Sequence, residues 1–81
     1  MRKINREPKE FWEDKKWGEG KYPQLQDEYP NKWIAIVNKK VVASGKSLKN
    51  TEIEAERKTG VPRDRIPVLF VEGDVNILYK V

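Results

Sequence analysis

Neither cysteine nor histidine occurs in this chain of 81 residues, which also contains a single methionine. Without cysteine, the chain has no disulfide bonds, no zinc–thiolate site and no thiol nucleophile. Without histidine, it lacks the commonest metal ligand and the commonest general base at neutral pH. Both absences argue against an enzyme, so we expect no catalytic residue, no metal site, no cofactor and no small-molecule substrate.

Long apolar runs are also missing, and no stretch approaches the roughly 18 residues that a membrane span needs. The first ten residues are basic but lack the apolar segment of a signal peptide. We therefore expect a cytoplasmic protein with no membrane partner. Charged residues make up 37% of the chain, which also favours a thermophilic source, because such proteins are enriched in Lys and Glu.

The formal net charge is +4, and it is unevenly distributed. Residues 1–31 carry seven Lys/Arg and seven Asp/Glu, whereas residues 32–81 carry ten Lys/Arg and six Asp/Glu. The positive excess is modest and lies on the part of the chain with the stronger strand signals. It permits an acidic partner such as nucleic acid without requiring one.

The stretch from Tyr29 to Gly45 organises the chain, because it predicts a β-hairpin. The apolar run Trp33–Val37 and the shorter run Val41–Ala43 flank a polar corner at residues 38–40. The first run is apolar on both faces, which is typical of a central strand covered on both sides. Lysines at the corner are typical of an edge strand guarded against stray pairing.

A helix is predicted after the hairpin, over Leu48–Thr59. Gly60 ends the helix, and Pro62 prevents it from continuing. Its start is either Ser47 as N-cap or Thr51, whose spacing to a glutamate matches a capping box.

At helical spacing the predicted buried stripe is thin, and it contains Leu48, Thr51, Glu52, Ala55 and Thr59. Ile53 lies well away from the stripe, so either the helix is covered on two sides or Ile53 is exposed. Ile66–Val71 is a third strand, and Val75–Val81 is either a fourth strand or an extension beyond a bulge.

The N-terminal part is predicted to be an arm, residues 1–23, joined to a core domain, residues 24–81. A short helix over Lys9–Trp17 ends at Gly18, and residues 18–23 form a breaker-rich linker. Gln24–Glu28 then makes one helical turn that directs Leu25 inward. The expected fold is a small α+β domain in which a ββαβ sheet, with a fourth strand as an option, packs on one main helix and the helical arm covers the rest.

The motif Y-P-x-K-W-x-A-x-V at residues 29–37, with Ala43-x-Gly45-Lys46 and Pro67-Val68-x-Phe70-Val71, resembles a short domain family of archaeal and some bacterial proteins. That family is known as a domain of unknown function. The resemblance covers about residues 24–72 and implies a ββαβ arrangement, with no chemistry attached.

Aromatic side chains are unusually dense in the charged N-terminal arm. One interpretation is that the arm folds back to cover the sheet. The other is that it docks on a protein partner or a second copy, because Trp and Tyr dominate interface hot spots. The candidate partner-binding residues are Phe11, Trp12, Trp17 and Tyr22.

Basic residues of the core predict a second candidate surface, where phosphates would be bound. The candidate nucleic-acid-binding residues are Lys39, Lys40, Lys46, Arg63 and Arg65. A solvated surface of a lysine-rich protein is the favoured interpretation of these residues. Gly45-Lys46-Ser47 resembles the end of a P-loop, but the glycine required five residues earlier is Lys40.

The function best supported at this point is a non-catalytic protein-interaction module, whose partner is either another protein or a second copy of the chain in a homodimer. Its candidate surfaces are the aromatic arm and the open strand edge at Val41–Ala43 or Val75–Val81. The alternative is a nucleic-acid-binding accessory protein that uses the basic face.

Overall fold

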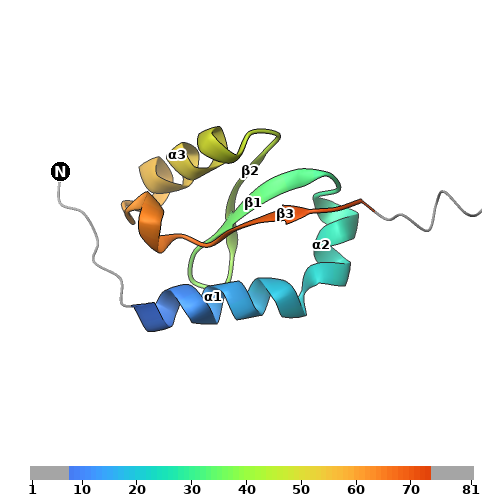
Figure 1. Cartoon of the computed structure of the whole chain (residues 1–81), viewed down its shortest axis with the longest axis horizontal. Helices are drawn as coiled ribbons and strands as arrows, with labels where there is room; N and C mark the ends of the chain where they lie inside the picture. Colours follow the sequence, from blue (N-terminus) through green and yellow to red (C-terminus); the bar gives the residue numbers. More distant parts are fainter. Residues whose placement is uncertain (1–7, 74–81) are drawn as a thin grey trace, which may run out of the picture.

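The computed structural model describes residues 8–73, which form three helices and a three-stranded antiparallel sheet (Figure 1). In chain order the elements are α1 (Pro8–Gly20), α2 (Tyr22–Glu28), β1 (Lys32–Ile36), β2 (Val41–Gly45), α3 (Leu48–Thr59), the 3-10 turn η1 (Arg63–Arg65) and β3 (Val68–Val71). The predicted α+β class and the hairpin are confirmed. The strand predicted over residues 75–81 lies outside the described residues.

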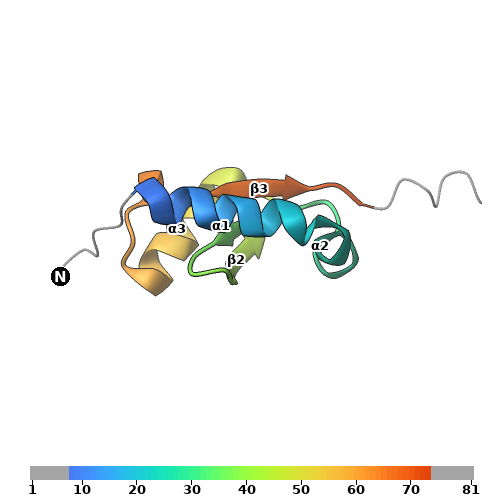
Figure 2. The same cartoon turned by 90° about the horizontal axis from the view of Figure 1, so that it is seen from below.

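The strand order is β2-β1-β3, so the apolar run of β1 is the central strand, as expected. Both neighbours pair with β1 in antiparallel fashion, and β2 and β3 therefore run parallel to each other on its two sides. Helix α3 connects them across one face of the sheet, which is a split βαβ arrangement. Helices α1 and α2 lie on the opposite face (Figures 1 and 2).

The sheet separates two hydrophobic cores, which explains why β1 is apolar on both faces. On the α3 face, the buried residues are Ala35, Val37, Ala43, Ala55, Val61 and Ile66. On the face of α1 and α2, the buried residues are Leu25, Ile34, Ile36 and Val71, with Trp17 and Leu69 packed against them. The predicted inward direction of Leu25 is confirmed.

Helix α1 does not end at Gly18, and that prediction is wrong. The helix continues to Gly20, and only Lys21 separates it from α2. Gly18 is buried against the sheet, where a Cβ atom would lie 2.5 Å from Ile36 Cδ1 and 2.9 Å from Leu69 Cδ1. The glycine is present because the helix approaches the sheet too closely for a side chain, and not because the helix must stop.

Helix α3 has the predicted bounds, and its caps explain them. The Ser47 hydroxyl accepts a hydrogen bond from the Asn50 amide at 3.2 Å, and Gly60 ends the helix with φ of 78°. The predicted buried stripe is partly wrong: Thr51 and Ala55 are buried, whereas Leu48 is 41% exposed. Ile53 is 42% exposed, so the helix is covered on one side only.

The β1–β2 turn is a two-residue hairpin in which Asn38 and Lys39 have φ of 55° and 59°. Such a turn matches the twist of the strands but is unfavourable for a lysine. The buried carboxylate of Asp14 in α1 accepts hydrogen bonds from the amides of both residues, at 3.0 and 2.9 Å. Helix α1 therefore fixes the hairpin from which β2 departs.

Candidate functional site at the edge of the sheet

The outer side of β2 is an open strand edge. In β1 the Ile36 amide donates to the Pro67 carbonyl on the β3 side, at 3.1 Å. Because the backbone groups of an antiparallel strand alternate in direction, Ala35 must bond towards β2, where its partner is Ala43. The neighbouring residue, Ser44, therefore directs its amide and carbonyl away from the sheet. Within residues 8–73, no strand pairs with that side of β2.

The opposite edge of the sheet is closed by side chains at the C-terminal end of β3, around Phe70 and Glu72. The Tyr22 hydroxyl donates to the Phe70 carbonyl at 3.4 Å and accepts from the Glu72 amide at 2.9 Å. The Gln26 side-chain amide donates to the Glu72 carbonyl at 3.2 Å. Helix α2 thus supplies partners for the backbone groups that another strand would otherwise bind.

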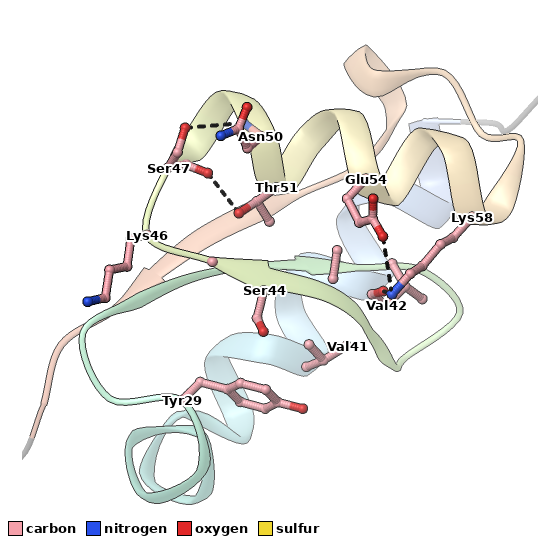
Figure 3. Close-up of a pocket in the computed structure, with 12 residues that line it drawn as sticks. Tyr29, Val41, Val42, Ser44, Lys46, Ser47, Asn50, Thr51, Glu54 and Lys58 are labelled. Carbon is pink, nitrogen blue, oxygen red and sulfur yellow. Dashed lines mark hydrogen bonds and ion pairs between the residues drawn. The ribbon is translucent and has the colours of Figure 1, made fainter.

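A groove of about 650 Å³ runs along the open edge of β2 (Figure 3). Strand β2 forms its floor. Asn50, Glu54 and Lys58 of α3 form one wall, and Tyr29 lies on the other side of the strand, below Ser44 in Figure 3. Backbone donors and acceptors beside a helix are the arrangement in which peptide-binding domains accept an additional strand.

The start of α3 is held tightly against the end of β2. The Thr51 hydroxyl donates to the Ser47 carbonyl at 2.8 Å, and a Cβ atom on Gly45 would lie only 3.1 Å from that hydroxyl. This close approach keeps the helix wall of the groove in register with the strand. It also accounts for the Gly45-Lys46-Ser47 motif as a strand end followed by a helix cap.

One side chain reaches over the open edge. The Lys58 ammonium lies 3.3 Å from the Val42 carbonyl and 3.7 Å from a Glu54 carboxylate oxygen (Figure 3). The side chains are 54% and 35% exposed, so the ion pair contributes only about 0.5 kcal/mol. An incoming strand displaces this contact at little cost.

The four aromatic residues predicted to bind a partner have different environments. Trp17 is half-buried against the core, and Tyr22 is committed to the β3 edge. Trp12 is 60% exposed, lies edge-on to Phe11 at 5.4 Å between ring centroids and has the Lys15 ammonium 5.1 Å from its ring. Phe11 and Trp12 line a shallow hollow of about 230 Å³ beside η1.

The five basic residues predicted to bind nucleic acid lie in three places. Lys39 and Lys40 are at the hairpin turn, whereas Lys46 follows the far end of β2. Arg63 and Arg65 belong to η1, where the Arg63 guanidinium pairs with Glu56 at 3.3 Å and Arg65 lines the hollow of Trp12.

Two functional features were missed from the sequence. Ser44 and the α3 wall of the groove were not candidate residues, although the edge at Val41–Ala43 was. Ser44 is a single polar residue in a short strand, which is a weak signal, because the direction of its backbone groups depends on the register with β1. Asp14, whose carboxylate holds the hairpin turn, was not among the predicted site residues.

No cluster of three or more potential metal-ligating side chains occurs within residues 8–73. None of the helices in that range has the length and apolar character needed to cross a membrane.

Residues 24–71 match the model of a family described as a family of unknown function, DUF5678. The match spans more than half of the 81 residues. The chain belongs to this family. The matched range contains every residue that lines the groove, and the expected resemblance to a domain of unknown function is confirmed. Helix α1 and Tyr22 precede the DUF5678 match. Searches among curated proteins and among solved structures found no match.

Proposed function

We propose that this protein is a non-catalytic protein-interaction module that binds an extended segment of another protein as a fourth strand along β2. The observation that supports the proposal is the difference between the two edges of one sheet. Side chains of α2 occupy the β3 edge, while the β2 edge presents Ser44 to a groove. Each backbone hydrogen bond formed there contributes about 1 kcal/mol.

A binding role fits the groove better than a catalytic one. Its single carboxylate, Glu54, pairs with Arg57 and Lys58 of the same helix. The groove has hydroxyl groups from Tyr29, Ser44, Ser47 and Thr51, but its lining holds no histidine and no carboxylate other than the paired Glu54 to activate them. Backbone pairing needs no such group.

The test uses proline as a block on the open edge. Ser44→Pro removes the outward amide but no hydrogen bond to β1, and proline is tolerated at such edge positions. Ser44→Ala is the matched control, because it changes the side chain and keeps the amide. A random peptide library displayed on phage is enriched on the wild-type protein, and enriched peptides are then measured against both variants.

Strand addition predicts peptides that bind the wild type and Ser44→Ala but lose about fivefold or more in affinity for Ser44→Pro, since one hydrogen bond of about 1 kcal/mol is lost. Circular dichroism must show the same fold for all three proteins. No enrichment on the wild type, or enriched peptides that bind Ser44→Pro equally well, would contradict the proposal.

Nucleic-acid binding is the alternative function, and one observation favours it. Two shallow hollows place a tryptophan near a basic residue, Trp12 with Arg65 and Trp17 with Lys39. Against it, Phe11 and Lys15 already contact the Trp12 ring, which reduces the surface on which a base would stack.

Fluorescence anisotropy with labelled single-stranded DNA and RNA separates the two functions. The alternative requires binding that persists at physiological salt and is lost in Lys39→Glu/Lys40→Glu. Binding seen only at low salt would assign the positive charge to surface solvation and remove the alternative.

A further inference from the structure

We infer that the segment bound along β2 is acidic at both ends and uncharged in its middle. This inference rests on the strand addition proposed above and specifies its partner. The side chains of β2 itself are uncharged, from Val41 to Gly45. An exposed lysine lies immediately outside each end, Lys40 before the strand and Lys46 after it.

These two ammonium groups are available to a partner. Among residues 8–73, neither Lys40 nor Lys46 forms an ion pair with a described carboxylate. Lys58, the other basic residue that lines the groove beside Lys46, lies near Glu54, a carboxylate that also pairs with Arg57. The charge that an incoming strand meets is therefore positive, and it is concentrated at the two ends of β2.

The spacing of the lysines sets the spacing of the acidic residues. Lys40 and Lys46 are six positions apart, which corresponds to about 20 Å along a strand. Cross-strand neighbours of opposite charge attract, so carboxylates five or six positions apart in the bound segment meet both lysines. The β1–β2 register shifts between Ala35 and Ile36, which marks a bulge in β2. Because the bulge alters the alternation of side chains along β2, a separation of five or of six positions is compatible with the two lysines.

The same lysines disfavour a second copy of this chain as the partner. If two β2 strands pair in antiparallel fashion with Val42 of one opposite Ser44 of the other, both outward backbone positions are used. Lys40 of each copy then lies opposite Lys46 of the other. Like charges directly opposite each other in a sheet are destabilising, so an acidic segment of another protein fits the edge better.

The experiment uses labelled nine-residue peptides and fluorescence anisotropy. The first peptide is Ser-Glu-Thr-Val-Thr-Val-Thr-Glu-Ser, with both termini blocked. Three matched peptides serve as comparisons. In one, glutamine replaces both glutamates, and in another lysine replaces both. The third has the composition of the first peptide, with both glutamates moved to the centre. We expect each glutamate to raise the affinity of the first peptide about two- to fivefold over that of the glutamine peptide. The lysine peptide should have the lowest affinity.

Charge reversal on the protein supplies the second arm. Lys40→Glu/Lys46→Glu is expected to invert the order, so that the lysine peptide binds more tightly than the glutamate peptide. Lys9→Glu/Lys21→Glu is the matched control, because it changes the net charge equally on exposed residues at the start of α1 and just after its end, on the other face of the sheet. That control must retain the wild-type order.

The outcomes distinguish this inference from the proposed function. If the glutamate and glutamine peptides bind equally and both lose affinity for Ser44→Pro, strand addition stands and the acidic specificity is wrong. If the centred glutamates bind as well as the terminal ones, or the α1 control inverts the order, the local placement of charge is wrong.

If the glutamate peptide does not bind while library-derived peptides do, the acidic specificity is wrong and strand addition stands. A mass that doubles without peptide and falls in Ser44→Pro would make a second copy the partner.

Discussion

The two edges of this small sheet differ in what lies beside them. Along β3, the side chains of Tyr22 and Gln26 bond to outward backbone groups. Along β2, the backbone of Ser44 faces a groove, and within residues 8–73 the exposed Lys58 is the one side chain that reaches a neighbouring carbonyl. Proteins usually block both edges to prevent stray pairing. This difference between the two edges of one sheet is the observation that supports the proposed binding along β2.

The largest effect is expected from Asp14→Ala. This variant removes the carboxylate that holds the hairpin turn between β1 and β2, the strand with the open edge. The variant leaves the amides of Asn38 and Lys39 without their buried acceptor, in a turn that requires positive φ at both. Hydrogen bonds to charged groups contribute most, and we expect a loss of about 3 kcal/mol in the free energy of unfolding. Urea denaturation measures it. A loss below about 1 kcal/mol would mean that α1 does not hold the hairpin.

Two glycines of α1 form a matched pair that tests how the helix sits on the sheet. Gly18→Ala places a Cβ atom against Ile36 and Leu69, and overpacking of this kind costs about 1–3 kcal/mol. Gly20→Ala meets no atom within 4 Å and should stabilise the helix by up to about 1 kcal/mol. Thermal unfolding of both variants should show opposite signs. The same sign for both would contradict the close approach of α1.

Tyr22→Phe removes the hydroxyl that closes the β3 edge and keeps the ring. We expect a loss of about 1 kcal/mol in the free energy of unfolding, since two exposed hydrogen bonds disappear. The variant also opens the second edge, so light scattering should show more self-association than in the wild type. A variant that remains monomeric and binds peptide only at β2 would show that closure of β3 does not depend on this hydroxyl.

The smallest effect is expected from Lys58→Met, which removes the ammonium group over the β2 edge and keeps the apolar stem. The free energy of unfolding should change by no more than about 0.5 kcal/mol, because the ion pair is exposed. Peptide affinity, measured by anisotropy, should be unchanged or slightly higher. A clear loss of affinity would assign Lys58 a direct contact with the bound segment.

The parts of the fold that depend on neighbours in sequence were predicted well. Ser47 and Gly60 define the ends of α3 through contacts within one helical turn, so their residue types are sufficient. The apolar run of β1 likewise predicts a central strand without any knowledge of its partners.

Features that join distant residues could not be predicted in this way. Gly18 was expected to stop a helix, because its packing partners Ile36 and Leu69 are far away in the sequence. The role of Tyr22 depends on a backbone carbonyl 48 positions away. The open edge at Val41–Ala43 was among the predicted surfaces, but the difference between the two edges required the three-dimensional arrangement.

The most direct test of that difference is amide hydrogen exchange measured residue by residue in the free protein. Strand addition at β2 predicts fast exchange of the Ser44 amide, slow exchange of the neighbouring Ala43 amide and protection of the Glu72 amide by the Tyr22 hydroxyl. In Tyr22→Phe, the Glu72 amide should lose its protection and exchange fast. A Ser44 amide as protected as that of Ala43 would show that the β2 edge is already paired, and would contradict the proposed binding site.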